Sequence, residues 1–141
     1  MHIILAYEIA KEEARKFYAN IRILLSPALG KDIHFSAAGF NHIIFKRARI
    51  ERNKSPQMER FELLPLAVKL LKTATTYQEF EKRHDGLYWG IVGIMENRKI
   101  KVVLWQPRKS GQVYFWSIIP NPITSRRRDL RFFEINSKNT A

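Results

Sequence analysis

Hydrophobic side chains recur at two spacings along this chain, first every three or four residues and later every second residue. Over residues 8–25 the spacing is helical and basic side chains fill many of the positions between, which predicts an amphipathic helix. Pro27 and Gly30 should end that helix. Ser36 is a suitable N-cap for a shorter helix over residues 37–47. This part of the chain therefore predicts two helices.

A third helix is predicted over residues 55–74, and the spacing changes after it. Pro56 suits the first helical position, where a backbone donor is not needed. Pro65 should break or restart the helix, because an interior position needs that donor. Alternating stretches rich in Val, Ile, Tyr, Phe and Trp then predict strands over residues 87–95, 100–106 and 112–119, with 78–82 as a candidate first strand.

The order of these elements predicts an α+β domain, with N-terminal helices packed on a four- to five-stranded antiparallel sheet. The connections between the strands are short and polar, which favours hairpins. A chain of 141 residues is expected to form one domain. We assign residues 1–120 to this domain and residues 121–141 to a basic C-terminal tail, in which 130–135 is a candidate edge strand.

The charge of the chain favours a polyanionic partner. Lys and Arg total 25 against 13 Asp and Glu, which gives a net charge of +12 and a pI near 10.2. Nucleic acid is the usual partner of such a chain, and an anionic membrane surface or an acidic protein inhibitor are the alternatives. There is no cysteine, so disulfides, thiol catalysis and cysteine-bound zinc are excluded. No apolar stretch suggests a signal peptide or a membrane span, so action in the cytoplasm is expected, with delivery by a secreted carrier left open.

Two histidines followed by a cationic run are the main candidates for chemistry. His34 is expected on an extended segment, and His42, Lys46 and Arg49 would share one polar face of the predicted 37–47 helix and the residues just after it. Histidine transfers protons near neutral pH, whereas Lys and Arg, here including Arg47, bind phosphate oxygens. This combination favours metal-independent cleavage of RNA by attack of the 2′-hydroxyl. The alternative is that a histidine packs in the core and the cations only solvate a face.

Two polar residues interrupt the apolar faces of the late strands. Gln106 continues the face of Leu104, and Ser117 continues the face of Phe115. Hairpin pairing predicts that Ser117 lies opposite Val102. Either polar side chain could bond a phosphate or a base, and the alternative for both is a rim position near a strand end.

Trp116 and Arg60 are weaker candidates for RNA contacts. Trp116 is one of five Trp and Tyr residues on the predicted strands that could stack on bases, although strand aromatics are more often core. Arg60 either points to the same cleft or is a surface charge. The run over residues 126–128 is a generic basic footprint.

The run His-Phe-Ser-x-x-Gly-Phe-Asn-His-Ile-Ile-x-Lys over residues 34–46 resembles the start of small bacterial and phage-associated toxin domains. Segments 63–67, 101–106 and 115–117 follow it in the expected order. These domains belong to the barnase–EndoU–colicin–RelE superfamily. The resemblance implies N-terminal helices on a four- or five-stranded antiparallel sheet. It also implies a metal-independent endoribonuclease without a cofactor, acting on tRNA or mRNA and restrained by an antitoxin or immunity protein.

Carried over by position, the resemblance assigns catalytic roles to His42, to Lys46 or Arg49, and to Ser117. No glutamate is evident in the position of the barnase base, so the general base stays unassigned. Two other functions remain open. One is a non-catalytic RNA- or DNA-binding protein, and the other is a basic module that binds an acidic protein.

Overall fold

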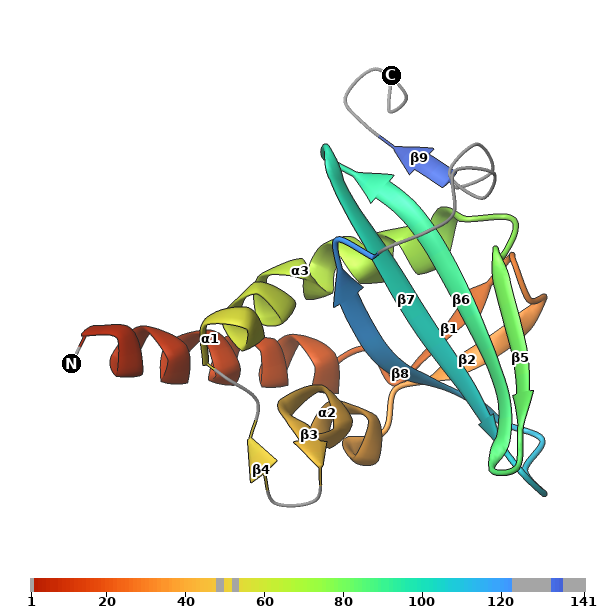
Figure 1. Cartoon of the computed structure of the whole chain (residues 1–141), viewed down its shortest axis with the longest axis horizontal. Helices are drawn as coiled ribbons and strands as arrows, with labels where there is room; N and C mark the ends of the chain where they lie inside the picture. Colours follow the sequence, from red (N-terminus) through yellow and green to blue (C-terminus); the bar gives the residue numbers. More distant parts are fainter. Residues whose placement is uncertain (1, 48–49, 52–53, 123–132, 136–141) are drawn as a thin grey trace.

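The computed structural model describes residues 2–47, 50–51, 54–122 and 133–135, with the backbone alone at 2–4, 44–47, 50–51, 54–56 and 133–135 (Figure 1). The helices are α1 (His2–Ala19), α2 (Ala37–Ile44) and α3 (Lys54–Thr73). The strands are β1 (Ile23–Ser26), β2 (Lys31–His34), β3 (Phe45–Arg47), β4 (Ile50–Glu51), β5 (Glu79–Arg83), β6 (Gly86–Met95), β7 (Arg98–Pro107), β8 (Val113–Pro120) and β9 (Phe133–Ile135).

The predicted α+β class is confirmed, and the sheet is larger than expected. Its strand order is β1-β2-β8-β7-β6-β5, and β9 pairs with β6. The predicted antiparallel meander is present as β5 to β8. The β2–β8 and β6–β9 pairs are parallel, so the seven-stranded sheet is mixed rather than purely antiparallel. The two extra strands, β1 and β2, extend the sheet beyond β8 and come from the region between the first two helices.

The predicted end of the first helix was wrong. α1 ends at Ala19, whereas the helical spacing ran over residues 8–25. Arg22 has a φ of 62°, a left-handed conformation that ends the helical path. The following residues form β1, which pairs with β2 through a turn closed by a 2.8 Å bond from the Gly30 amide to the Ser26 carbonyl. Pairing across this turn outweighs the helical spacing of the apolar residues.

The second helix begins as predicted and ends early. Ser36 caps it, because its Oγ accepts a 3.1 Å bond from the Gly39 amide. The helix ends at Ile44, and Phe45–Arg47 then forms β3 of a two-stranded hairpin with β4. Lys46 therefore does not lie one helical turn after His42, and the predicted shared helix face was wrong.

Pro65 does not interrupt the third helix, contrary to the prediction. α3 runs without a break from Lys54 to Thr73. The proline ring is exposed, whereas Leu64 before it and Ala67 after it are buried. Packing of both halves of α3 outweighs the one backbone bond that the proline removes.

The helices cover one face of the sheet. α3 contacts β8, β7, β6 and β1, and α1 packs against α3 (Figure 1). Leu70, Leu71, Val102 and Phe115 are fully buried between these layers. The other face of strands β5 to β8, which we call the open face, is not covered by α1 or α3. This asymmetry leaves one side of four strands for other contacts.

The C-terminal segment contributes the short strand β9, which confirms in part the edge strand expected over residues 130–135. Residues 126–128, the predicted basic footprint, lie outside the described residues. Among the helices that the structure describes, none is long and apolar enough to cross a membrane.

Candidate functional site

A β-bulge in β8 decides which side chains reach the open face. Phe115 and Ile118 are both fully buried although they are three residues apart, which a regular strand does not allow. Ser117 pairs with Val103, whereas Phe115 pairs with the very next residue of β7. Trp116 is therefore the extra residue of the bulge. Trp116 and Ser117 both line the open face, opposite to the core.

The predicted position of Ser117 was wrong in register and in face. It was expected opposite Val102, on the core side with Phe115. The bulge shifts it by one residue, to a position opposite Val103 on the open face. It is 8% exposed there, so its hydroxyl lies low in the wall of a hollow.

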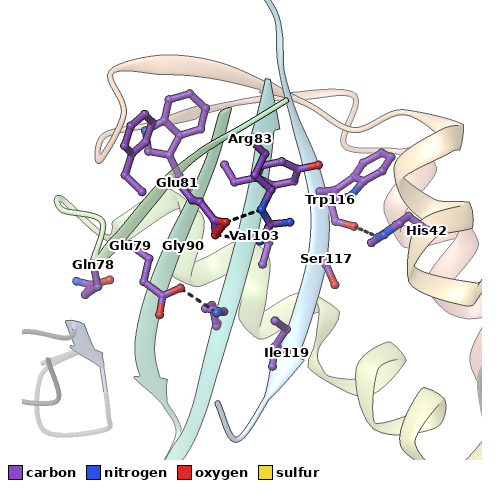
Figure 2. A pocket seen from close by; sticks show the side chains of 14 residues that line it. His42, Gln78, Glu79, Glu81, Arg83, Gly90, Val103, Trp116, Ser117 and Ile119 are labelled. Carbon is purple, nitrogen blue, oxygen red and sulfur yellow. Dashed lines mark hydrogen bonds and ion pairs between the residues drawn. The ribbon is translucent and has the colours of Figure 1, made fainter. Parts of the chain in front are cut away.

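The open face contains a hollow of about 620 Å³ (Figure 2). Its walls come from the end of α2 and from the open side of β5, β6, β7 and β8. Its lining includes His42, Glu79, Tyr88, Lys101, Trp116 and Ser117. The hollow therefore gathers a histidine, a carboxylate, an ammonium group and a hydroxyl from four different elements.

A row of neighbouring aromatic rings crosses the open face. The rings of His42 and Trp116 stack with centroids 4.4 Å apart at 22°. Trp105 follows, with its ring centroid 4.4 Å from that of Trp116 and tilted by 47°. Tyr88 lies 6.2 Å beyond Trp105, at 21°. The Arg83 guanidinium carbon lies 4.4 Å from the Tyr88 ring centroid and ends the row. The tryptophans and the tyrosine are half-buried, so each still presents ring surface.

The tautomer of His42 follows from its partner. Nδ1 lies 3.0 Å from the carbonyl oxygen of Trp116. A carbonyl can only accept a hydrogen bond, so Nδ1 carries the proton. In the neutral ring, Nε2 is then the nitrogen with the lone pair. The helix, the stack on Trp116 and this bond together fix the orientation of the imidazole.

Glu79 and Lys101 form an ion pair across the hollow. The Lys101 Nζ lies 2.9 Å from Glu79 Oε1, and the two side chains are 19% and 26% exposed. They meet above Gly90, which lies between them on β6. A Cβ at Gly90 would lie 2.9 Å from Glu79 Oε1 and 3.3 Å from the Lys101 Cδ. The missing side chain is therefore what lets the two charged groups meet.

The far rim of the hollow is also charged. Arg83 donates two hydrogen bonds to the Glu81 carboxylate, at 2.7 and 3.1 Å. These bonds lower the pKa of Glu81 and raise that of Arg83. Burial raises the pKa of Tyr88 to about 12, helped by the 2.8 Å bond that its hydroxyl donates to Asp85. The Tyr88 hydroxyl therefore stays protonated at neutral pH.

Three of the predicted residues lie elsewhere. The Arg60 Nε donates a 3.2 Å bond to the carbonyl of Ile118, and burial lowers the pKa of its guanidinium. Gln106 lies at the turn end of β7, where its Nε2 donates a 2.8 Å bond to the Ser110 carbonyl. His34 lies on β2 and pairs with Tyr114 of β8, and the centroids of the two rings are 5.8 Å apart. None of the three lines the hollow.

The predicted cations after α2 are only partly described. Lys46 and Arg47 belong to β3, but their side chains lie outside the description. Arg49 lies outside the described residues altogether. Of the predicted site, the hollow thus brings together His42, Trp116 and Ser117.

Glu79 and Lys101 were missed by the sequence reasoning. The signal that could have found them is Gly90, a glycine inside a strand of large side chains, which often marks a close approach. Within the described ranges, no three His, Asp or Glu residues are grouped so that they could hold a metal ion.

Comparison of the chain with protein-family models, with curated proteins and with solved structures gives no match. The likeness to the barnase–EndoU–colicin–RelE superfamily therefore rests on the sequence segments and the order of elements alone.

Proposed function

We propose that the open face binds single-stranded RNA and that the protein cleaves it as a metal-independent endoribonuclease of the toxin type. One observation carries this proposal. Proton-transfer groups, a cation and a hydroxyl border the same hollow that Trp116 and Tyr88, two members of the row of rings, also line. A face with only a structural role would not need both these polar groups and the exposed rings.

The rings supply the binding surface. Unpaired bases stack on aromatic side chains, with about 1–3 kcal/mol for each base, and a duplex cannot offer its base faces in this way. Trp116, Trp105 and Tyr88 lie in a line over three adjacent strands. A strand of RNA that stacks on them would place its backbone along the charged sides of the hollow.

His42 and Glu79 are the proposed proton-transfer residues. One of them takes the proton from the 2′-hydroxyl, whose oxygen then attacks the phosphorus. The bond to the 5′-oxygen breaks, and the other residue gives that oxygen a proton, which leaves a 2′,3′-cyclic phosphate. The Nδ1 bond to Trp116 prepares His42 for this role, because it leaves Nε2 as the basic nitrogen.

Lys101 and Ser117 are the proposed charge-stabilising residues. The ammonium group and the hydroxyl can donate hydrogen bonds to phosphate oxygens as negative charge grows on them. Ser117 lies next to Trp116 in the bulge, and Lys101 is paired with Glu79. This arrangement would hold the phosphate between the two proton-transfer groups.

The deciding experiment is RNA cleavage in the presence of EDTA. We expect single-stranded RNA to be cut, with cyclic-phosphate ends detected by mass spectrometry. His42→Ala and Glu79→Gln should each lower the rate by about 10²- to 10⁴-fold. Glu62→Gln, an exposed glutamate on α3, is the matched control and should cut at the wild-type rate. RNA that stays intact, or an unchanged rate in both hollow variants, would remove the enzyme.

The row of rings by itself favours a second function, which is non-catalytic binding of single-stranded nucleic acid. A comparison of RNA with single-stranded DNA of the same sequence distinguishes the two functions. A binding protein would hold RNA and single-stranded DNA of the same sequence intact. A ribonuclease of this mechanism would cut the RNA only, because DNA lacks the 2′-hydroxyl.

A partner of opposite charge is part of the proposal. A basic toxin is expected to be restrained by an acidic antitoxin or immunity protein that covers the open face. Growth arrest on expression that is relieved by His42→Ala would support the toxin function, and arrest that persists in that variant would count against it.

A further inference from the structure

The β5–β6 and β7–β8 hairpins turn near each other (Figure 1, lower right). A second hollow, of about 460 Å³, lies at these turns. We call it the basic turn pocket. Its lining includes five basic residues, namely Lys82, Arg83, His84, Arg108 and Lys109. No Asp or Glu is among its lining residues. The pocket is therefore suited to an anion.

Three cations of this pocket are not neutralised nearby. Lys82, Arg108 and Lys109 form no ion pair with any residue that the structure describes. Asp85, in the adjacent turn, accepts a 2.8 Å bond from the Tyr88 hydroxyl on the open face. Arg83 is paired with Glu81 at the rim. The pocket itself thus keeps at least three unpaired positive charges.

Hydrogen bonds hold the two turns together. The Arg108 amide donates a 3.1 Å bond to the Asp85 carbonyl, which joins one hairpin to the other. Gln106 fixes the second turn through its bond to the Ser110 carbonyl. The basic side chains therefore extend from an ordered frame, which lowers the entropy lost when they bind a ligand.

Lys109 occupies a backbone conformation that suits glycine better. Its φ of 69° lies in the left-handed region, which is unfavourable for a residue with a Cβ. A lysine here costs stability that a glycine would not. Lys109→Gly would therefore increase stability and at the same time remove one positive charge from the pocket. A role of Lys109 in binding can thus be told apart from a role in stability.

The basic turn pocket is continuous with the open face. Arg83 lines both hollows, and it also ends the row of rings at Tyr88. We propose that the pocket binds a backbone phosphate of the same RNA strand whose bases stack on the open face. The inference rests on the proposed function. It adds that the substrate is a strand long enough to pass from His42 across the sheet and around the hairpin turns.

The test is RNA affinity as a function of length, measured by fluorescence anisotropy with oligonucleotides of about 4 to about 16 nucleotides. Wild-type protein should show a step of about tenfold in affinity once the strand reaches the pocket. Lys82→Glu/Lys109→Glu should abolish the step and leave the shortest RNA bound as in wild type. Lys69→Glu/Lys72→Glu reverses two exposed charges on α3 and should keep the step.

Lys109→Gly tests the pocket in a variant that should fold at least as well as the wild-type protein. It should raise the melting temperature, because it relieves the left-handed backbone, and should still reduce the affinity step for long RNA. The slope of log affinity against log salt should fall by about 0.7 for the lost phosphate contact. A variant that is more stable and keeps the full step would overturn the inference.

The outcomes separate the two proposals. Short RNA that binds with no gain on lengthening overturns the pocket alone, whereas no RNA binding at any length overturns the open face as well. A free phosphate is the other source of the same chemistry. If Lys82→Glu/Lys109→Glu loses binding of a nucleoside monophosphate but keeps the length step, the pocket serves a free nucleotide and the inference fails.

Discussion

The two faces of β7 are built from alternating residues of a single strand and differ in almost every property. Ile100, Val102 and Leu104 point to the helices and are fully buried. Lys101 and Trp105 alternate with them, are half-buried, and face the open side. The first set holds the layers together. The second set makes contacts that stability alone does not require, such as an ion pair over a glycine.

Adjacent residues of the strand should respond differently to truncation. Leu104→Ala should lower the free energy of unfolding by about 2–5 kcal/mol, because it leaves a cavity in the core. The protein that remains folded should bind RNA with the wild-type affinity. Urea denaturation followed by RNA titration below the transition measures both. A large loss of RNA affinity at full folding would mean that the two faces are not independent.

Gly90→Ala tests the ion pair of the open face. The added Cβ would lie 2.9 Å from Glu79 Oε1 and 3.3 Å from Lys101 Cδ, so both side chains of the ion pair must shift. We expect a loss of about 1–3 kcal/mol in stability and a fall in RNA cleavage. Gly111→Ala is the control, since a Cβ there meets nothing within 4 Å. Thermal unfolding and the cleavage rate are the measurements, and equal behaviour of the two variants would contradict the role of Gly90.

Trp105→Ala removes the middle of the row of rings. RNA affinity should fall by about 1–3 kcal/mol, with a salt dependence like that of wild type, because stacking releases no counterions. Leu104→Ala, one residue away, provides the comparison. If Trp105→Ala binds RNA normally, the rings belong to the structure rather than to the ligand surface.

The smallest expected effect is a loss of stability at high pH. The pKa of Tyr88 is raised from 10.0 to about 12 in the folded protein. A raised pKa contributes stability that is complete below pH 10 and is lost as the pH rises towards 12. Tyr88→Phe should remove this part of the pH dependence. Thermal unfolding across this window, with ultraviolet absorbance to follow tyrosine ionisation, measures it, and an unchanged profile in the variant would contradict the assignment.

Local patterns predicted the late strands well and the early elements less well. Alternation of apolar residues placed β6, β7 and β8 within about two residues at each end, because a sheet buried on one side imposes that alternation. Residues 20–25 were assigned to a helix because they continue its apolar spacing. The neighbouring β2 offers them backbone pairing instead, and no periodicity contains that information.

The sequence also predicted part of the candidate site. Ser117 was predicted because it is a polar residue in an apolar strand, and His42 because it is a histidine on a polar helix face. Both line the hollow. Lys46 was joined to His42 by helical spacing, and that link failed when the helix ended at Ile44. Glu79 was not found, because its importance depends on a lysine 22 residues away and on the glycine between them in the sheet.

By itself, the sequence determined the α+β class, the buried side of β7 and the strongly basic charge. These follow from spacing and composition, which act within one element or over the whole chain. Only the tertiary structure decided which groups meet. The bulge brings Trp116 and Ser117 to one face, Gly90 lets Glu79 reach Lys101, and the Trp116 carbonyl orients His42. Each depends on the register between distant segments, which is set by packing rather than by any local pattern.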